Sequence, residues 1–257
     1  MGEYHREEKI RGVSFFVAPE QLSEREARIT GPDVNHIVNV LRMKVGERLM
    51  ISAGEDWEYL CEIRALSREA VELTVLEENA DVRELPVEIT LYQGLPKGDK
   101  LELIIQKAVE LGVRRVVPVE TRRCVAKLDK RKAEARVRRW QAIAESAAKQ
   151  SGRRVIPEVA LPLSFSEALK EAEESELCMI PYEKAEGMEA TRALISSVEP
   201  GDRVAVMIGP EGGFEESEVQ EAQERGFTAL TLGKRILRTE TAGLVVLSLL
   251  MAETEGR

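Results

Sequence analysis

Residues 203–214 read RVAVMIGPEGGF, and residues 227–242 read FTALTLGKRILRTETA. Each segment starts with a short apolar run typical of a buried strand and continues into a loop that contains glycine. We expect the runs at 203–208 and 227–232 to be neighbouring strands of one sheet. Ligands of α/β sheets usually bind beyond the carboxyl ends of the strands, so the pattern predicts a ligand-binding edge. A second interpretation stays open here, in which each loop is only a tight connection from a strand to a helix.

From residue 86 onward, further strand and helix patterns alternate along the chain. Apolar runs predict strands, and runs with one apolar face predict helices. The expected strands span 87–93, 116–119, 155–159 and 177–180, and the expected helices span 99–111, 130–150, 166–172 and 240–253. Alternation of this kind is typical of a mainly parallel α/β sheet. The last helix is apolar almost throughout, so we expect it to be buried against the sheet or a second subunit.

Residues 14–80 show a different pattern, in which short β-rich runs are separated by turn residues. The expected strands span 14–17, 48–52, 59–66 and 70–76, with one helix near 33–42. This pattern predicts a small barrel or sandwich. The polar stretch that follows ends in Pro86, which restricts the residue before it to extended conformations. We therefore expect two domains, at 1–80 and 86–257.

The composition argues against several classes of protein. With 257 residues, of which 43% are hydrophobic, the chain can form a packed core. It has three widely spaced cysteines and two histidines, so we expect neither a disulfide framework nor a metal site. The apolar stretch 244–252 is too short to span a bilayer, and residues 1–10 are charged rather than signal-like. We therefore expect a cytoplasmic protein.

The net charge of −9 conceals an uneven distribution. Residues 97–154 contain 17 basic and 7 acidic residues, a net charge of +10, whereas the rest of the chain contains 20 basic and 39 acidic residues. A basic run of this kind is either a set of solvated helix faces or a surface that binds phosphates. The sequence alone leaves both interpretations open.

The residues of the two glycine loops indicate what kind of ligand they could bind. Residues 209–213 match neither the GxGxxG fingerprint nor a Walker A loop, so glycine here lets backbone groups approach a flat ligand. In the second loop, Arg238 stands directly before a helix that we expect Thr239 to cap. The helix macrodipole disfavours a cation at this end, so Arg238 calls for an anionic partner. A structural ion pair with Glu240 and a direct chemical role both fit the spacing.

Several motifs, in order along the chain, resemble the RsmE family of bacterial ribosomal RNA methyltransferases in the SPOUT superfamily. The motifs are HIVNVLRM at 36–43, LPKGDKLELIIQKAVELGV at 95–113, CVAKLD at 124–129, RWQAIA and KQSGR within 139–153, PYE at 181–183, IGPEGG at 208–213 and LGKRILRTETA at 232–242. The resemblance therefore covers nearly the whole chain. Members of this family methylate N3 of a uridine in small-subunit (16S) ribosomal RNA.

The resemblance implies an N-terminal PUA-like β-barrel for RNA, a C-terminal α/β domain with a trefoil knot, and a homodimer. It also implies that S-adenosylmethionine is held by the knot loops, at the ends of three strands. Carried onto this chain, the cofactor-binding residues would be Pro181, Tyr182, Glu183, Ile208, Gly209, Pro210, Gly212, Gly213, Leu232, Gly233, Arg235, Ile236 and Leu237.

Methyl transfer to N3 requires the loss of its proton, and the negative charge that results needs stabilisation. We assign the stabilising role to Arg238, with Glu240 or Glu211 as proton acceptor or charge partner. The expected partner is small-subunit ribosomal RNA, in the assembled subunit. Contacts to it, mostly to phosphate, are expected from Arg42, Lys97, Lys100, Arg122, Arg123, Lys127, Arg153 and Arg154.

The chain departs from the family pattern in the helix after its tryptophan, where relatives carry carboxylates and this chain has Ser146 and Lys149. We expect Lys149 to strengthen the attraction for phosphate. Relatives also tend to have proline where Lys234 stands. Two other functions remain open. One is methylation of another RNA atom, such as a ribose 2′-hydroxyl, and the other is a noncatalytic role in RNA binding or ribosome assembly.

Overall fold

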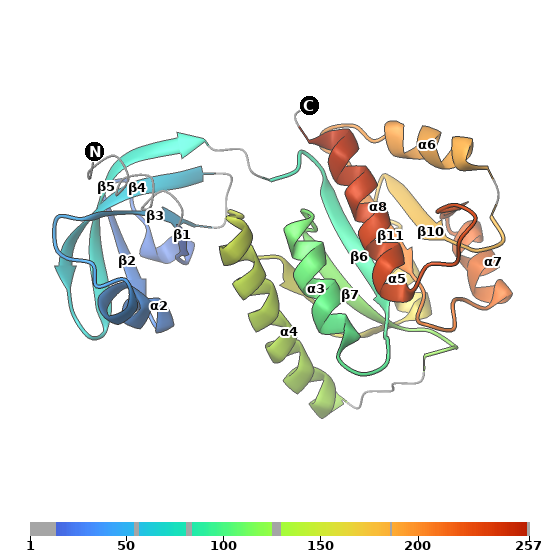
Figure 1. The fold of residues 1–257 in the computed structure, drawn as a ribbon, viewed down its shortest axis with the longest axis horizontal. Coiled ribbons are helices and arrows are strands. Elements are labelled where there is room, and N and C mark those ends of the chain that lie inside the picture. Colours follow the sequence, from blue (N-terminus) through green and yellow to red (C-terminus); the bar gives the residue numbers. More distant parts are fainter. Residues whose placement is uncertain (1–13, 54–56, 81–83, 125–129, 186, 256–257) are drawn as a thin grey trace. The chain divides into compact units, whose positions relative to one another are not determined.

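The structure of the protein is a computed structural model, which describes residues 14–53, 57–80, 84–124, 130–185 and 187–255. The chain forms two compact units. The first comprises Met1–Glu84 and Ala148–Ile156, and the second comprises Leu85–Ala147 and Pro157–Arg257. In Figure 1 the strands of the first unit are blue to cyan, and the second unit holds the elements from β6 onward.

The first unit is built on a five-stranded sheet. Its strands are β1 (Ser14–Phe16), β2 (Glu26–Thr30), β3 (Arg48–Ser52), β4 (Trp57–Leu66) and β5 (Ala70–Ala80), in the order β1-β3-β4-β5-β2. The β1–β3 pair is parallel and the other pairs are antiparallel. Alternate residues such as Leu49 and Ile51 face one apolar core, as the pleat of a strand requires. The β-rich pattern is thus confirmed, although the sequence pattern did not predict β2.

The helix expected near 33–42 is shorter and less regular than the prediction. Helix α2 covers Pro32–Asn35, and a π-helical segment continues over His36–Val40. Arg42 then adopts a left-handed backbone conformation with φ 54°. A residue with a Cβ rarely adopts this conformation, and the helical path ends there.

The second unit is built on a sheet in which every pair of neighbouring strands is parallel. Its strands are β6 (Glu88–Gly94), β7 (Arg115–Glu120), β8 (Glu158–Val159), β9 (Leu163–Ser164), β10 (Leu177–Pro181), β11 (Arg203–Ile208) and β12 (Thr228–Leu230). The order is β12-β10-β11-β6-β7-β8, with β9 also paired to β7. This confirms the predicted parallel α/β architecture.

Helices cover both faces of this sheet. On one face, α3 (Lys100–Glu110) lies against α8 (Thr239–Thr254), and α8 also contacts β11 and α6 (Met188–Ser196) (Figure 1). On the other face, α5 (Phe165–Ala172) and α7 (Glu216–Glu224) pack into one core cluster with strand residues such as Tyr92 and Met207. The remaining helix of this unit, α4 (Lys130–Ser151), extends into the first unit with its last residues.

The structure corrects two details of the sequence prediction. The runs at 203–208 and 227–232 are not neighbouring strands, because β10 lies between β11 and β12. The strand expected at 155–159 is reduced to Glu158–Val159, the only part of that run that pairs with β7. Among the described residues, no helix is both long and apolar enough to cross a membrane.

Candidate functional site

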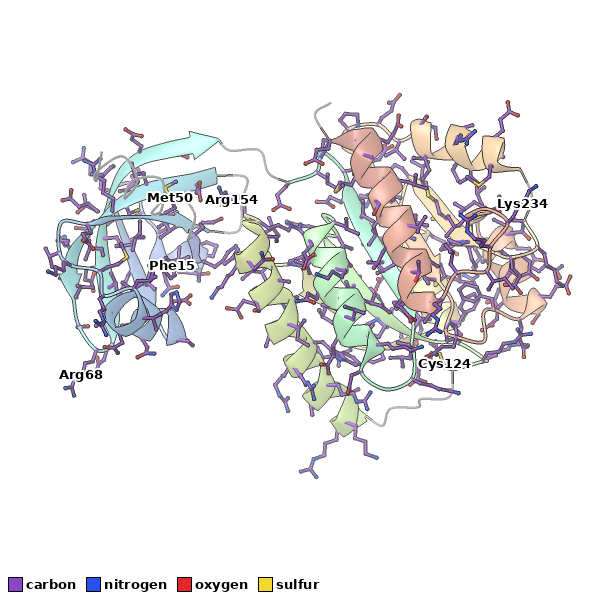
Figure 2. The ribbon with its side chains drawn as sticks, viewed as in Figure 1. Phe15, Met50, Arg68, Cys124, Arg154 and Lys234 are labelled. Atoms are coloured by element: carbon purple, nitrogen blue, oxygen red, sulfur yellow. The ribbon has the colours of Figure 1, made fainter. Side chains whose placement is uncertain are left out.

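A cavity of about 570 Å³ lies in the second unit, where β10 and β11 end. Three loops form its wall: the residues after β10, the glycine loop after β11, and the segment between β12 and α8. Lys100, in the first turn of α3, also borders it. The lining residues are Lys100, Pro181 to Glu183, Ile208 to Phe214, Thr231 to Thr239 and Ala242. Lys234, labelled in Figure 2, marks the third loop.

Glycine is required where these loops pass close to other backbone. A Cβ on Gly94, the last residue of β6, would lie 2.7 Å from Cδ of Pro210, so only glycine lets the loop after β11 cross there. Gly213 has φ +66°, and its N–H donates to the carbonyl of Pro210 at 2.9 Å. Gly233 has φ +108°, and a Cβ there would meet nothing within 4 Å. A side chain at Gly233 would therefore extend into open space beside the cavity.

Buried polar side chains tie the loops to the sheet. The hydroxyl of Thr239 donates to the carbonyl of Gly209 at 2.6 Å and accepts from Nε2 of Gln93 at 2.9 Å. Gln93 is fully buried. Thr239 does not cap α8 as expected, because Arg238 occupies the N-cap position and its carbonyl accepts from the N–H groups of Thr241 and Ala242. The threonine hydroxyl instead links β6, the loop after β11 and α8.

All thirteen predicted cofactor residues border this one cavity. They come from three loops that are far apart in the sequence. Ile236 is 90% exposed although it borders the cavity, whereas Leu237 is half-buried.

The two candidate carboxylates meet at Lys100 rather than at Arg238. The ammonium group of Lys100 lies 2.9 Å from Oε1 of Glu211 and 3.5 Å from Oε2 of Glu240. The backbone N–H of Lys97 also donates to Glu211, at 3.1 Å. Glu211 borders the cavity, whereas Glu240 does not. The structural ion pair weighed for Glu240 therefore exists, but its partner is Lys100.

These contacts determine the charge states. Partial burial would raise the pKa of the Glu211 carboxyl, but the hydrogen bonds from Lys100 and from the Lys97 N–H hold that pKa below its usual range. The hydrogen bond to Glu211 raises the pKa of the Lys100 ammonium. Glu211 is thus an ionised carboxylate that binds protons weakly, and Lys100 stays charged.

Arg238 is exposed at the cavity wall. No hydrogen bond or ion pair to its guanidinium occurs among the described residues. It also lies at the positive end of the α8 macrodipole, which opposes a cation. Arg238 is therefore a cation held beside the cavity with its donors available to an anionic ligand.

The predicted RNA contacts fall into different environments. The side chains of Arg42, Lys97, Arg122 and Arg123 are exposed. Arg123 donates to the carbonyl of Gly212 at 2.8 Å, next to the cavity. Lys127 lies outside the described residues. The ammonium group of Lys100 is paired with two carboxylates, and its contact with RNA stays a prediction.

Arg153 and Arg154 are corrections, because both are buried in the first unit. Arg154 (Figure 2) is 1% exposed, and its Nη2 lies 2.6 Å from Oε2 of Glu58. Arg153 is 5% exposed and pairs with Glu84. Buried guanidinium groups held by carboxylates cannot reach the phosphates of an RNA. Lys149, expected to attract phosphate, is likewise held by both carboxylate oxygens of Asp33 at 3.0 Å.

Among the described residues, neither the cysteine thiols nor a cluster of metal-ligating side chains forms a second reactive or metal-binding site. Burial raises the pKa of Cys61 to about 12 and that of Cys178 to about 11, so both are protonated at neutral pH. Cys124 (Figure 2) lies 3.2 Å from the Thr121 hydroxyl. Within the part of the chain that the structure describes, no group of three or more His, Cys, Asp or Glu side chains could hold a metal ion.

The sequence analysis missed two features of the site. Gln93 anchors Thr239 from the end of β6, and Lys100 holds the two carboxylates. A signal for Gln93 was present, since a polar residue at the carboxyl end of an otherwise apolar strand points to a buried hydrogen bond there. No comparable signal existed for Lys100, because its partners are more than a hundred residues away.

Comparison with known proteins matches this geometry to one group of enzymes. Residues 83–251 match the RNA methyltransferase domain family, and residues 29–76 match the RNA methyltransferase PUA domain family. The chain is 40% identical over 230 residues to ribosomal RNA small subunit methyltransferase E of Bacillus subtilis, covering 88% of this chain and 90% of that protein.

Two solved structures extend the similarity to the fold. One is ribosomal RNA small subunit methyltransferase E of Neisseria gonorrhoeae bound to S-adenosyl methionine, with 34% identity, a TM-score of 0.79, and 93% and 97% of the two chains covered. The other is a Legionella pneumophila methyltransferase with bound SAM, with 32% identity, a TM-score of 0.80 and the same coverage. With its RNA methyltransferase domain, its PUA domain and the loop-lined cavity, this chain belongs to the ribosomal RNA small subunit methyltransferase E family.

Proposed function

We propose that this protein transfers a methyl group from S-adenosylmethionine to N3 of a specific uridine in small-subunit (16S) ribosomal RNA. One observation carries the proposal: all thirteen residues that the family resemblance assigns to the cofactor border one cavity, and Arg238 on its wall is exposed and has no ion pair among the described residues. The names of the relatives support the choice of RNA, and the solved relatives support the cofactor.

The cavity fits S-adenosylmethionine in size and in chemistry. Its volume of about 570 Å³ lies within the range of small-molecule sites. Much of its wall is loop backbone, brought close by glycines such as Gly209 and Gly213. Backbone N–H and C=O groups of such loops can read the edge of an adenine. When bound, the cofactor supplies an electrophilic methyl group on a positively charged sulfur.

Arg238 stabilises the uridine anion. Loss of the N3 proton to solvent leaves a negative charge shared with the two flanking carbonyl oxygens, and a guanidinium can donate to such an anion. Arg238 is suited to this because it is exposed at the wall and is held where the helix dipole gives it no stabilisation. The loops supply alignment, which accounts for a large part of the rate of a displacement reaction.

Glu211 and Glu240 act as charge partners of Lys100 rather than as the proton acceptor. Glu211 already accepts from the Lys97 N–H and from Lys100, so its affinity for a further proton is low. Glu240 stands outside the cavity wall and faces the same ammonium group. Together the three charges fix the start of α3 against the glycine loop and the start of α8.

The test compares product formation with cofactor binding. Arg238→Ala should lower methyl transfer by about 10²- to 10³-fold, the usual loss for one donor to a developing anion. Its affinity for S-adenosylmethionine, measured by calorimetry, should stay within about twofold of wild type. Arg192→Ala, which removes an exposed cation from α6, is the matched control and should be fully active. Wild-type turnover in Arg238→Ala would contradict the assignment.

The substrate is tested with assembled small subunits and with naked ribosomal RNA as methyl acceptors. Mass spectrometry of the digested nucleosides should find a base-methylated uridine at one position. Methylation on ribose, or binding of RNA without any affinity for S-adenosylmethionine, would contradict the proposal in favour of the two alternative functions. Activity on subunits alone would indicate that folded RNA shape is recognised. With such a substrate, we propose a cytoplasmic location for the enzyme.

We further propose that the protein is a homodimer with a trefoil knot in its second unit. Support for the dimer comes from α8, which is apolar almost throughout and leaves Leu249 39% exposed. Support for the knot comes from the path of the chain. β12 lies at the sheet edge beyond β10, whereas α8 packs on β11, so residues 231–238 must cross two strand ends. Sedimentation of wild type and Leu249→Glu tests the dimer, and an experimental chain trace tests the knot.

A further inference from the structure

The first half of α4 carries a set of exposed cations that the proposed catalytic site does not use. Five basic side chains are exposed there: Arg131, Lys132, Arg136, Arg138 and Arg139. At about 100° per residue they fall within an arc of about 160° around the helix. The buried residues Ala133, Trp140 and Ala144 lie on the opposite side. We call these five cations the α4 ridge.

Three of the five ridge cations have no carboxylate partner among the described residues. Glu134 lies just outside the arc, three residues after Arg131 and four before Arg138, but no ion pair joins it to either arginine among the described residues. Arg139 pairs with Glu102 at 2.9 Å. Arg131, Arg136 and Arg138 have no ion pair within the described part of the chain. Opposite charges at i,i+4 spacing stabilise a helix only where they pair, so the guanidinium groups of Arg131 and Arg138 stay available to an outside partner.

The ridge also opposes its own helix. No acidic residue is present in the first turn of α4, and Arg131 and Lys132 lie at the positive end of the macrodipole. A cation at this end lowers the stability of the helix. An anion bound at this end would offset that cost. The arrangement therefore favours a negatively charged partner over plain solvent exposure.

The ridge lies at the same edge of the sheet as the cavity. In a parallel α/β sheet a helix runs back against the strands, so α3 and α4 begin at the carboxyl ends of β6 and β7 (Figure 1). The ion pair between Arg139 and Glu102 joins α4 to the first turn of α3. Lys100, in that same turn, borders the cavity. One partner can thus reach the ridge and the cavity at once.

We propose that the α4 ridge binds the phosphate backbone of the substrate RNA and holds it beside the methyl-transfer cavity. The partner class rests on the proposed function. Guanidinium groups match phosphate oxygens in a two-pronged geometry, and four of the five cations are arginines. From residue 131 to residue 139 the helix rises about 12 Å. A nucleic-acid strand carries about one phosphate per 3.4 Å of axis, so the ridge spans several phosphates.

The experiment removes three unpaired cations from the ridge and three from elsewhere. The test variant is Arg131→Gln, Arg136→Gln and Arg138→Gln together. The control is Arg114→Gln, Lys170→Gln and Arg192→Gln, which are exposed residues of the second unit at the start of β7, in the last turn of α5 and within α6. Both variants change the net charge by the same amount. Calorimetry with S-adenosylmethionine verifies that each variant is folded.

Binding of small-subunit ribosomal RNA is then measured at a series of salt concentrations. The ridge variant should bind about ten- to a hundredfold more weakly, and the slope of log affinity against log salt should fall by about 2 to 3, as expected for three lost phosphate contacts. The control should keep the wild-type slope. Equal losses in both variants, or an unchanged slope in the ridge variant, would overturn the proposal.

The outcome is independent of the methylation assay. If wild-type protein binds the RNA with a slope that the ridge variant reduces, the ridge is an RNA-binding surface even where no methylated product forms. If wild type methylates N3 and the ridge variant binds as wild type does, the proposed function stands and the ridge proposal is wrong.

Discussion

The two ends of the basic segment 130–154 have similar composition and different surroundings. In the first half of α4, three arginines have no carboxylate partner among the described residues. At 149–154, by contrast, Lys149, Arg153 and Arg154 are each held by a carboxylate of the first unit. The difference teaches that a run of positive charge does not identify a nucleic-acid surface. What distinguishes the two regions is whether a distant part of the chain supplies the counter-charge.

Of the substitutions that compare the two regions, replacement of Arg154 should lower the free energy of unfolding most. Arg154→Met leaves the buried Glu58 carboxylate, 5% exposed, without its guanidinium partner. The free energy of unfolding should fall by about 3–5 kcal/mol, because an uncompensated buried charge is costly. Urea denaturation of the full chain measures it. Adding Glu58→Leu should recover much of the loss, and a loss below about 1 kcal/mol in the single variant would contradict the described pairing.

A smaller loss of stability is expected from Glu84. Its carboxylate pairs with Arg153 and accepts from the backbone N–H of Arg154 at 2.9 Å and of Val155 at 3.3 Å. Glu84→Gln keeps the shape but removes the charge and one acceptor atom, which should cost about 2 kcal/mol. The same urea titration measures this. Glu88→Gln, on an exposed residue of β6, serves as the comparison and should be close to wild type.

The smallest effect on stability should come from the ridge. Arg136→Gln removes an exposed cation that has no partner within the described residues, so the midpoint of unfolding should change by less than the equivalent of about 0.5 kcal/mol. A destabilisation as large as that of Glu84→Gln would mean that Arg136 has a structural partner after all. The contrast between the two regions would then disappear.

The local sequence pattern was sufficient to predict most of the strands of the second unit. The apolar runs that form β6, β7, β10 and β11 are continuous because both faces of a parallel sheet are covered, and the prediction is close to the observed bounds. Strand order lies beyond such patterns. The insertion of β10 between β11 and β12 depends on long-range pairing, which no local period encodes. The short strand β2 is absent from the prediction because only Ala27 and Ile29 mark its buried face.

In the candidate site, too, some features could be predicted from local sequence and others depend on long-range contacts. Its glycine loops were recognisable as motifs, and every assigned cofactor residue borders the cavity. The partner of Glu240 was not recognisable, since sequence proximity favours Arg238 and the fold brings Lys100 within 3.5 Å instead. The role of Thr239 changed for a similar reason. A hydroxyl that could cap its own helix is used by Gly209 and Gln93 from other elements.

The sequence by itself determined the class of fold, the loops that form the cavity and the family. These depend on local period, on glycine where the backbone needs it, and on motifs in order. Only the tertiary structure decided which charges are available for a ligand. Burial and pairing depend on residues far apart in the chain, so Arg153 and Arg154 became internal ion pairs while Arg238 and the α4 ridge remained exposed. A guanidinium that is buried and paired with a carboxylate, as in Arg154, serves the fold and is not available to a ligand.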